Sequence, residues 1–313
     1  MSHVSARGWL LFVVMCVVWG VPYLFIKVAV DELSISTMVL ARTGIAAALL
    51  LPVAMYRGEV GPVLRRWRPL VAFAAVEIIV PWFFLGYAEQ RISSSLTGLL
   101  IAMVPLMAAL LALAGPEHER LGGRRVLGLL VGFVGVGALV GFEVGGGDLS
   151  AVLALVIVAL GYAVGPIVLA RWLADLPSLG VIAVSLTVSA LVYLPFGVAQ
   201  APSTMPSTRV VAAVVALAVL CTALAFLLFF ALIAEVGAAR AVVITYVNPA
   251  VALLLGVLLL DERFTVATAV GFSLILVGCV LATGRSAQAA PATVAAVGEP
   301  LSRPPERRGR VGS

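Results

Sequence analysis

Charged side chains are scarce in this chain of 313 residues. Only 11% of the residues are Asp, Glu, Lys or Arg and 63% are hydrophobic, whereas soluble domains have about 25% charged and roughly 45–50% apolar residues. Cysteine is also rare, and Cys16, Cys221 and Cys279 lie far apart within apolar stretches, so they predict neither a disulfide framework nor a metal site. The composition excludes a soluble catalytic domain and predicts a membrane protein.

The sequence also has few of the residues and motifs that carry catalysis. Its two histidines, His3 and His118, lie outside the apolar stretches, and neither H-E-x-x-H nor a pair of aspartates occurs within such a stretch. The phosphate-binding loop G-x-x-x-x-G-K-[ST] is missing, which disfavours ATP-driven transport within this chain. We therefore expect no catalytic residue, no metal and no cofactor.

Ten apolar stretches approach the length of about 20 residues that a membrane-spanning helix needs. They cover approximately residues 9–30, 34–56, 69–88, 92–114, 126–142, 149–170, 179–200, 208–234, 238–259 and 265–284. In the first half of the chain, arginine gathers in alternate connections, which predicts a cytoplasmic N-terminus (residues 1–8). An even number of spans then places the tail, residues 285–313, in the cytoplasm, and its Ala, Pro and Arg content predicts disorder.

Similar residues recur at a nearly constant offset along the chain. The pairs separated by 144 or 143 residues are Pro22/Pro166, Lys27/Arg171, Pro105/Pro249, Pro52/Pro195, Arg66/Arg209, Glu119/Glu262, Gly128/Gly271 and Gly135/Gly278. We interpret the recurrence as two homologous halves, residues 9–142 and 143–284, with five spans in each. Because five is odd, the second half starts on the opposite side of the membrane, which predicts inverted repeats of the kind found in many secondary transporters.

Several motifs occur in a fixed order across the two halves. The first apolar stretch contains Trp19, Gly20 and Lys27 in the form W-G-x-x-x-x-x-x-K, and the second contains Arg42 followed by small residues. Each half closes with a proline-bearing stretch, an acidic residue and glycines at regular spacing, at Pro105, Glu119, Gly128 and Gly135 and again at Pro249, Glu262, Gly271 and Gly278. In these features the sequence resembles the EamA-type members of the drug/metabolite transporter superfamily.

The resemblance implies an all-α polytopic membrane protein, a ten-helix bundle that moves small organic solutes such as amino acids, other metabolites or drugs, usually outward. The high content of Ala, Val and Gly, with 19 arginines and a single lysine, is typical of GC-rich bacterial genes. We therefore expect the plasma membrane of a bacterium.

Glu77 is the main candidate for transport chemistry. It lies about eight residues into the third apolar stretch and is the only acidic residue well inside one. Ionisable groups at that depth usually face a bundle interior or a water-filled cavity. Three interpretations stay open: reversible proton binding, pairing with a cationic amine of the substrate, or a structural pair with Arg42. The equivalent position in the second half is Leu220, so the carboxylate belongs to one half only.

Arg42 lies about eight residues into the second stretch. Its guanidinium offers paired donors that suit a substrate carboxylate, and the alternatives are snorkelling to the membrane surface or pairing with Glu77. Lys27 lies closer to the end of its stretch, where snorkelling is easier.

Aromatic residues inside the apolar stretches are candidates for the walls of a transport cavity, with packed or lipid-facing positions as the alternative. They are Trp19, Trp82, Tyr162 and Tyr246. Trp82 is the strongest because it follows Pro81 and lies five residues after Glu77. A second candidate segment combines the polar residues Thr245 and Asn248 with Pro249, which interrupts helical hydrogen bonding. We assign helix packing to the glycines of the fifth stretch, Gly128, Gly132, Gly135, Gly137 and Gly141.

These features favour a secondary transporter that works by alternating access, with a membrane channel and a membrane receptor or scaffold as the alternatives. The expected partners are a small-molecule substrate, protons and the lipid bilayer. The basic residues lie between the apolar stretches and in the tail, so they report topology and predict no nucleic-acid partner. A homodimer stays open as an assembly.

Overall fold

A computed structural model describes residues 5–114, 123–141, 148–241 and 243–283. Helices make up almost all of this part of the chain, and it contains no strand. Two of the expectations, the disorder of residues 285–313 and the role of Glu119, lie outside the described residues.

The helices of the first half include two spans that are interrupted and one that contains a π-helical turn. They are α1 (Ala6–Val18), α2 (Pro22–Ala29), α3 (Ile35–Tyr56), α4 (Val60–Arg65), α5 (Trp67–Ala74), η1 (a π-helix, Ala75–Ile79), α6 (Val80–Glu89), α7 (Ser94–Ile101), α8 (Val104–Ala114) and α9 (Gly123–Leu139).

The second half has fewer breaks in its spans but two π-helical turns. Its helices are α10 (Leu149–Val168), η3 (π, Leu169–Leu173), α11 (Ser178–Ala199), α12 (Thr208–Ala218), η4 (π, Val219–Leu224), α13 (Ala225–Val236), α14 (Ala238–Ala241), α15 (Ile244–Leu259) and α16 (Val266–Thr283).

Eight segments of the described chain are long and apolar enough to cross a membrane. They are Ala6–Ala29, Ile35–Tyr56, Trp67–Glu89, Ser94–Ala112, Leu149–Leu173, Ser178–Ala199, Thr208–Val236 and Val266–Thr283. α15 is apolar but has only 16 residues, and α9 has 17 and adjoins positions outside the described part. The expectation of a multi-pass helical protein is confirmed, while the count of ten stays a prediction.

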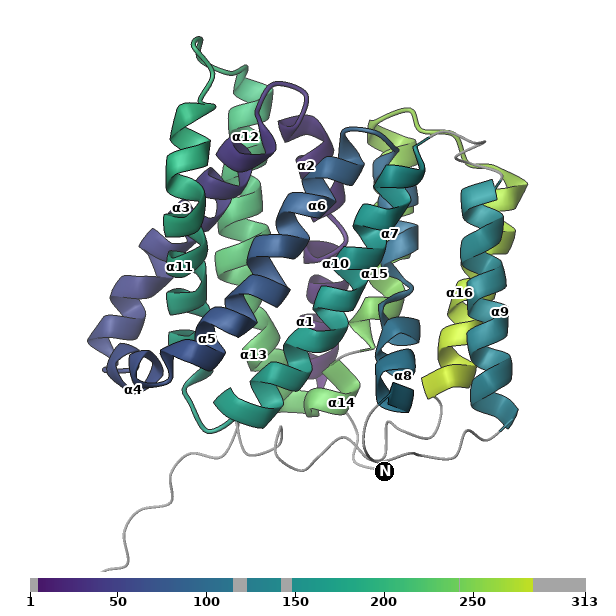
Figure 1. Cartoon of the computed structure of the whole chain (residues 1–313), viewed down its shortest axis with the longest axis horizontal. Coiled ribbons are helices and arrows are strands. Elements are labelled where there is room, and N and C mark those ends of the chain that lie inside the picture. Colours follow the sequence, from purple (N-terminus) through teal and green to yellow (C-terminus); the bar gives the residue numbers. More distant parts are fainter. Residues whose placement is uncertain (1–4, 115–122, 142–147, 242, 284–313) are drawn as a thin grey trace, which may run out of the picture.

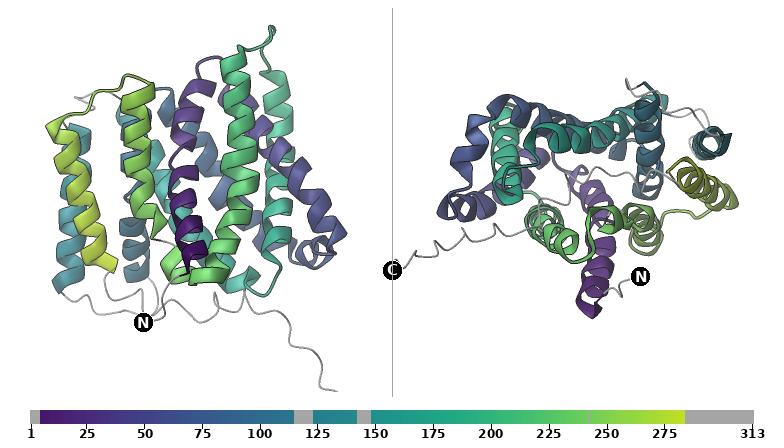
Figure 2. Two further views of the ribbon diagram at one scale, coloured as in Figure 1. Left: turned by 180° about the vertical axis from the view of Figure 1, so that it is seen from behind. Right: turned by 90° about the horizontal axis from the view of Figure 1, so that it is seen from below.

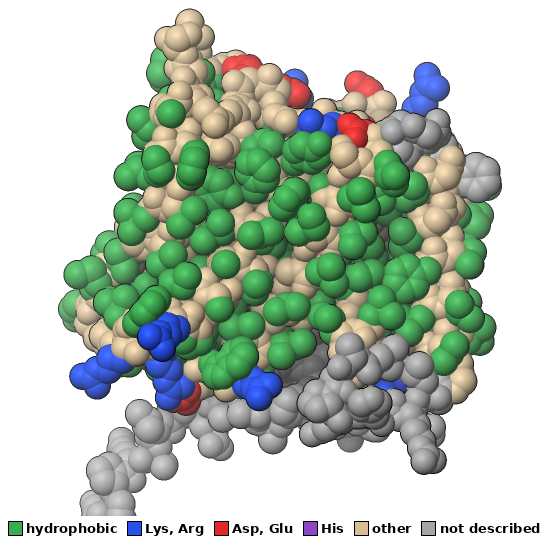
Figure 3. Space-filling model, viewed as in Figure 1, with side chains coloured by type: hydrophobic (Ala, Val, Ile, Leu, Met, Phe, Trp, Pro, Cys, Tyr) green, Lys and Arg blue, Asp and Glu red, His purple; other side chains and the backbone are tan. Residues whose placement is uncertain are grey.

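The surface of the bundle agrees with a lipid environment. Large apolar side chains are exposed on its sides, among them Leu130, Leu153, Leu191 and Leu258. In the view of Figure 3, hydrophobic side chains cover the middle of the face, and charged side chains gather at its upper and lower edges. Apolar flanks between two charged rims are what a bilayer requires.

Serine and proline set several of the helix starts. Ser34, Ser93 and Ser207 precede α3, α7 and α12, and each side chain accepts a hydrogen bond from the backbone N–H three residues later. Pro22 is the first residue of α2, where its missing N–H leaves no helical bond unmade, so the first span is broken after Trp19.

Helices from the two halves pack against each other in pairs. α9 lies along α16, α3 along α11, and α7 along α15. The pair α9 and α16 stands at one end of the bundle and the pair α3 and α11 at the other (Figures 1 and 2). Each pair joins helices that occupy corresponding places in the two halves of the sequence.

Glycines allow α9 and α16 to approach each other closely. A Cβ atom at Gly278 would lie 2.7 Å from the carbonyl oxygen of Gly128, and one at Gly135 would lie 2.8 Å from that of Gly271. The two contacts are equivalent. Gly128 corresponds to Gly271 and Gly135 to Gly278, so exchanging the halves turns one contact into the other. The packing role expected for Gly128 and Gly135 is confirmed, and Gly132 shares it, whereas Gly137 and Gly141 face open space.

A second exchanged contact lies at the rims. Arg66 donates to both carboxylate oxygens of Asp175 at 2.6 and 2.7 Å, which joins the start of the third span to the end of the sixth. The backbone N–H of Ser207 donates to Glu32 at 2.7 Å, which joins the end of the first span to the start of the eighth. Residues 32 and 175 are 143 positions apart, and Ser207 lies two residues before Arg209, the counterpart of Arg66, so the two contacts join corresponding segments of the halves.

Candidate functional site

Two π-helical turns lie at equivalent positions in the two halves. η1 interrupts the third span and carries Glu77, and η4 interrupts the eighth span and carries Thr222. A π-turn widens the helix by one residue and is frequent at functional sites. η1 is held from a neighbouring helix as well, because the Tyr193 hydroxyl of α11 donates to the Ile79 carbonyl oxygen at 2.7 Å.

Arg42 of α3 points into the bundle and is only 5% exposed. Its Nε donates to the Thr222 hydroxyl at 2.9 Å, and its guanidinium carbon lies 3.6 Å from the ring centre of Trp82. Thr222 in turn donates to the Leu217 carbonyl oxygen at 2.8 Å. The guanidinium is therefore fixed at one edge and on one face, while no described residue pairs with its two terminal nitrogens.

Glu77 is partly buried, and its carboxylate lies against Gly165 of α10, where a Cβ atom would overlap Oε2. Oε2 is buried and has no hydrogen-bond partner among the described residues. The ion pair between Glu77 and Arg42, one of the three interpretations of Glu77, does not form in the structure. A buried carboxylate oxygen without a partner costs free energy, so this group needs a ligand or a proton.

Tyr162 of α10 lies near both charged groups. It interacts electrostatically with both Glu77 and Arg42, and it also interacts with Trp82. Tyr23 of α2, which is buried, interacts electrostatically with Tyr162 and Arg42. Four of the eight expected site residues, Arg42, Glu77, Trp82 and Tyr162, thus lie together, and both halves of the chain contribute to the cluster.

The other four expected residues lie elsewhere. Trp19 is half-buried at the end of α1, and its ring packs against Phe229 and Phe226 of α13, with centroids 4.6 and 6.0 Å apart. Tyr246 shares a hydrogen bond of 3.2 Å with Thr283 of α16. These contacts join helices to one another, which is the packed alternative considered for the aromatic residues.

The Thr245–Pro249 segment is only partly buried. Asn248 is 8% exposed, and in one amide orientation its nitrogen donates to the Ile244 and Cys16 carbonyl oxygens at 2.9 and 3.1 Å. Thr245 is half-buried and makes an interaction of its own. No hydrogen bond or ring contact links Tyr246 or Asn248 to Arg42 or Glu77, so these two residues do not join the cluster.

The comparisons with known proteins agree with this geometry. The model of the EamA-like transporter family matches residues 6–141 and again residues 149–284. The chain belongs to the EamA family. Members of this family are transporters and not enzymes, so the chain is a multi-pass membrane protein of a transporter family.

A solved crystal structure shares the fold. It aligns with 90% of this EamA chain and 98% of its own chain, with a TM-score of 0.63 and 23% sequence identity. At that identity the likeness shows the fold alone. No curated protein matches the chain.

Two of the EamA motif residues hold helix ends in this protein. Lys27 donates through Nζ to the carbonyl oxygens of Glu89 and Ile92 at 2.5 and 3.0 Å, which satisfies the C-terminal end of α6. Glu262 accepts from the N–H groups of Ser94 and Ser95 at 2.7 and 2.9 Å, at the N-terminal end of α7.

Sequence reasoning missed two members of this EamA site, Thr222 and Tyr23, and also the buried carboxylate of Glu89 at the end of α6. Thr222 is a buried hydroxyl in the span of the second half that corresponds to the Glu77 span of the first half. The repeated spacing of the two halves could have identified it. Glu89 was passed over because it falls at the end of its apolar stretch, yet its side chain is 0% exposed.

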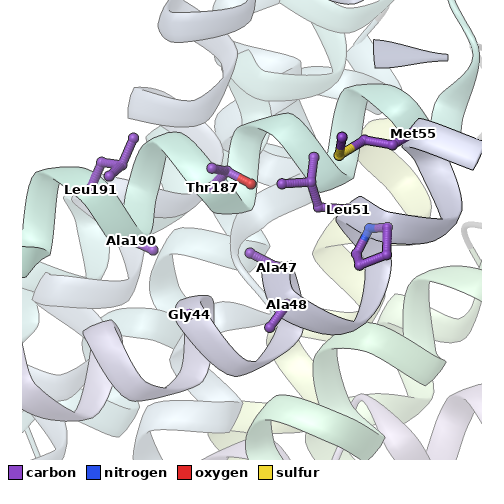
Figure 4. Close-up of a pocket in the computed structure, with 9 residues that line it drawn as sticks. Gly44, Ala47, Ala48, Leu51, Met55, Thr187, Ala190 and Leu191 are labelled. Carbon is purple, nitrogen blue, oxygen red and sulfur yellow. The ribbon is translucent and has the colours of Figure 1, made fainter. Parts of the chain in front are cut away.

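A groove on the flank of this EamA bundle is not the site. It lies between α3 and α11, holds about 440 Å³ and is lined by apolar residues and Thr187 (Figure 4). Its lining includes none of the charged or aromatic residues of the cluster around Arg42.

Proposed function

We propose that the protein is a secondary active transporter that exports small organic metabolites carrying a carboxylate, such as amino acids or acidic drugs, by alternating access. The observation that carries this proposal is the Arg42 guanidinium, which is buried, oriented by Thr222 and Trp82, and unpaired at its two terminal nitrogens. Two parallel N–H groups are the geometry that binds a carboxylate through both oxygens.

Energetics favour a charged ligand at this place. A buried cation without an anionic partner is costly, and a substrate carboxylate would supply that partner. The Trp82 ring covers one face of the guanidinium, which keeps its donors in one plane. Because Thr222 and Tyr162 come from one half and Arg42 and Trp82 from the other, a substrate bound here would contact both halves.

The proposed architecture is ten spans arranged as two inverted repeats in a bacterial plasma membrane, with both termini in the cytoplasm. The exchanged glycine contacts of α9 and α16 and the exchanged rim contacts of Arg66 and Glu32 support a two-fold relation between the halves. Inverted repeats can exchange conformations, which opens the central site to each side of the membrane in turn.

Glu77 is proposed as the coupling group. Its buried, unpartnered Oε2 lies near Tyr162, and a proton or a substrate amine would neutralise the carboxylate there. A substrate that carried both charges, as an amino acid does, would use Arg42 for its carboxylate and Glu77 for its amine.

The test is substrate counterflow in liposomes that contain only the purified protein, with labelled amino acids, nucleosides and cationic and anionic drugs. We expect uptake of carboxylate-bearing compounds, and a loss of about 30- to 150-fold in R42Q, since paired charge-assisted hydrogen bonds contribute about 2–3 kcal/mol. R66Q is the matched control because Arg66 pairs with the exposed Asp175 at the rim, and its counterflow should stay within about twofold of wild type.

Several outcomes would contradict the proposal. Equal counterflow in R42Q and wild type would remove Arg42 from the binding site. Flux that dissipates gradients but supports no counterflow would indicate a channel, and absence of flux for every compound would favour a receptor or scaffold.

A further inference from the structure

A second buried carboxylate lies at the opposite end of the third span from the cytoplasmic arginines. Glu89 is the last residue of α6, and its side chain is 0% exposed. Neither of its carboxylate oxygens has a hydrogen-bond partner among the described residues, which sets it apart from Glu262 and Glu59, whose oxygens accept backbone N–H groups. An ionised carboxylate in such a place would be unsolvated as well as unpaired.

The nearest cation is engaged elsewhere. Lys27 of α2 donates to the backbone carbonyl oxygen of Glu89 itself and to that of Ile92, and it makes no salt bridge with the Glu89 side chain. The Lys27 ammonium and the Glu89 carboxyl group therefore lie at the same end of α6 without forming a salt bridge. In a medium of low dielectric constant an ionised carboxylate would attract the nearby ammonium strongly into direct contact. The absence of that contact is what a neutral carboxyl group explains.

The other titratable groups around Glu89 come from α2, from the segment before α16 and from three elements that pack against α6. Lys27 and Tyr23 of α2 interact with it electrostatically, and so does Glu262 from the segment before α16. Arg42 of α3, Tyr162 of α10 and Glu77 of η1 lie on elements that also pack against α6. Of these neighbours, only Lys27 and Arg42 are cations, and Arg42 is held by Thr222 and Trp82.

We infer that Glu89 is a proton-binding site, neutral in this conformation, and that its deprotonation draws the Lys27 ammonium from the backbone carbonyl oxygens of Glu89 and Ile92 to the Glu89 carboxylate. The proton passes to water at the adjacent rim, and no other covalent bond forms or breaks. The buried carboxylate and the ammonium are then in direct contact. The carbonyl oxygens of Glu89 and Ile92 lose their common partner in this step.

The consequence is a change in the way α2 holds the end of α6. Lys27 is the side chain through which α2 holds the end of α6, and α2 is separated from α1 by the break before Pro22. The new ion pair keeps α2 joined to α6 through a different group of Glu89, and the break allows the outer part of the first span to adjust to it while α1 stays packed on α13. This inference goes beyond the proposed function, because a channel or a receptor with this structure would bind the proton in the same way.

Infrared spectroscopy of the full-length protein in liposomes tests the site without a substrate. At neutral pH, E89Q should remove the intensity of one protonated carboxyl group from the C=O stretching region of wild type. E59Q is the matched control, since Glu59 accepts the N–H of Gly180 at 2.9 Å and should remove carboxylate intensity instead. Identical wild-type and E89Q spectra in the protonated region would overturn the inference.

The role of Lys27 has its own measurement, which also serves if E89Q does not fold. K27M keeps most of the length of the side chain and removes the ammonium group, so deprotonation of Glu89 no longer gains a partner. The midpoint for loss of the protonated band should rise by about one pH unit or more relative to wild type. An unchanged midpoint in K27M would overturn the proposed movement of Lys27.

Discussion

At the centre of the bundle the first half carries Arg42 and Glu77, and the equivalent positions of the second half carry Ser185 and Leu220. Ser185 is fully buried, whereas Leu220 is 46% exposed on the flank of the bundle. The backbone keeps the correspondence, because Glu77 lies in η1 and Leu220 in η4. The fold is thus shared between the halves, and the charges are not.

The second half contributes hydroxyl groups where the first contributes charges. Thr222 orients the Arg42 guanidinium, and Tyr162 interacts with both Arg42 and Glu77. A site divided in this way depends on the relative position of the halves, since Thr222 of the second half orients Arg42 of the first and Tyr162 lies near both charges. Movement of one half against the other would change the site directly, which is what alternating access requires.

The largest effect should come from removing the charge of Glu77, which has no counterpart in the second half. Glu77→Gln mimics the protonated carboxyl group, so it should abolish accumulation driven by a pH gradient and leave counterflow between equal pools intact, because exchange needs no net proton movement. If Glu77 binds a substrate amine instead, both assays should fall. Leu220→Gln is the matched control in the second half, and it should change neither assay.

Gradient-driven accumulation at the wild-type rate in E77Q would exclude Glu77 from coupling. Loss of both assays in L220Q would show that the position matters through the π-turn and not through the carboxylate. Both variants should be compared at equal amounts of folded protein in the liposomes.

A smaller effect should follow from substituting the glycines that both halves use where α9 packs against α16. Gly278→Ala and its equivalent Gly135→Ala each bring a methyl group to within 2.8 Å or less of backbone atoms on the partner helix, so each should lower stability by about 1–3 kcal/mol. Gly137→Ala is the control, since nothing lies within 4 Å of its added carbon. Thermal unfolding in detergent measures the three variants.

A two-fold relation predicts losses of similar size at Gly278 and Gly135. Loss at one position with none at the other would mean that the exchanged contacts are not equivalent. Destabilisation by G137A as large as that by G278A would contradict the packing explanation.

Much of the fold could be predicted from the sequence because apolar length and repeated spacing are local signals. The glycine periodicity at Gly128 and Gly135 predicted close packing, and the structure confirms it. The interruptions of the spans were harder to predict. Pro22 marks the break in the first span, but nothing in the local sequence marks η1 as a π-turn, since η1 packs against α10 and α11.

The site was predictable only in part, for a related reason. Arg42 and Glu77 stand out as charges in apolar stretches, and both lie in the cluster. Tyr162 was among the aromatic candidates, but Thr222 is distant in sequence and nothing in its own stretch marks it, so only the fold shows that it binds Arg42. Asn248 attracted attention as a polar residue in a span, but its amide faces the Ile244 and Cys16 carbonyl oxygens, which explains its presence by packing.

The smallest effect should appear at the rim, where the exchanged contacts differ in chemistry. Glu32 accepts a hydrogen bond from the Ser207 N–H, and its bonding to Ser207 lowers the pKa of the exposed Glu32 carboxyl group. The equivalent Asp175 instead binds the Arg66 guanidinium. Because the folded pKa of Glu32 lies below its unfolded value of about 4.3, the stabilisation is complete above that pH and is lost as the pH falls through the folded pKa.

Glu32→Gln should therefore be slightly less stable than wild type at pH 7, and the two unfolding curves should converge as the pH is lowered below about 4. Added salt should reduce the difference in stability between E32Q and wild type at pH 7, since the Glu32 carboxylate is exposed to solvent. D175N gives the comparison for the other half and should weaken the opposite rim through loss of the Arg66 ion pair. A difference between E32Q and wild type that is the same at pH 7 and at pH 3.5 would show that the Glu32 charge contributes nothing, and that the contact acts through its shape alone.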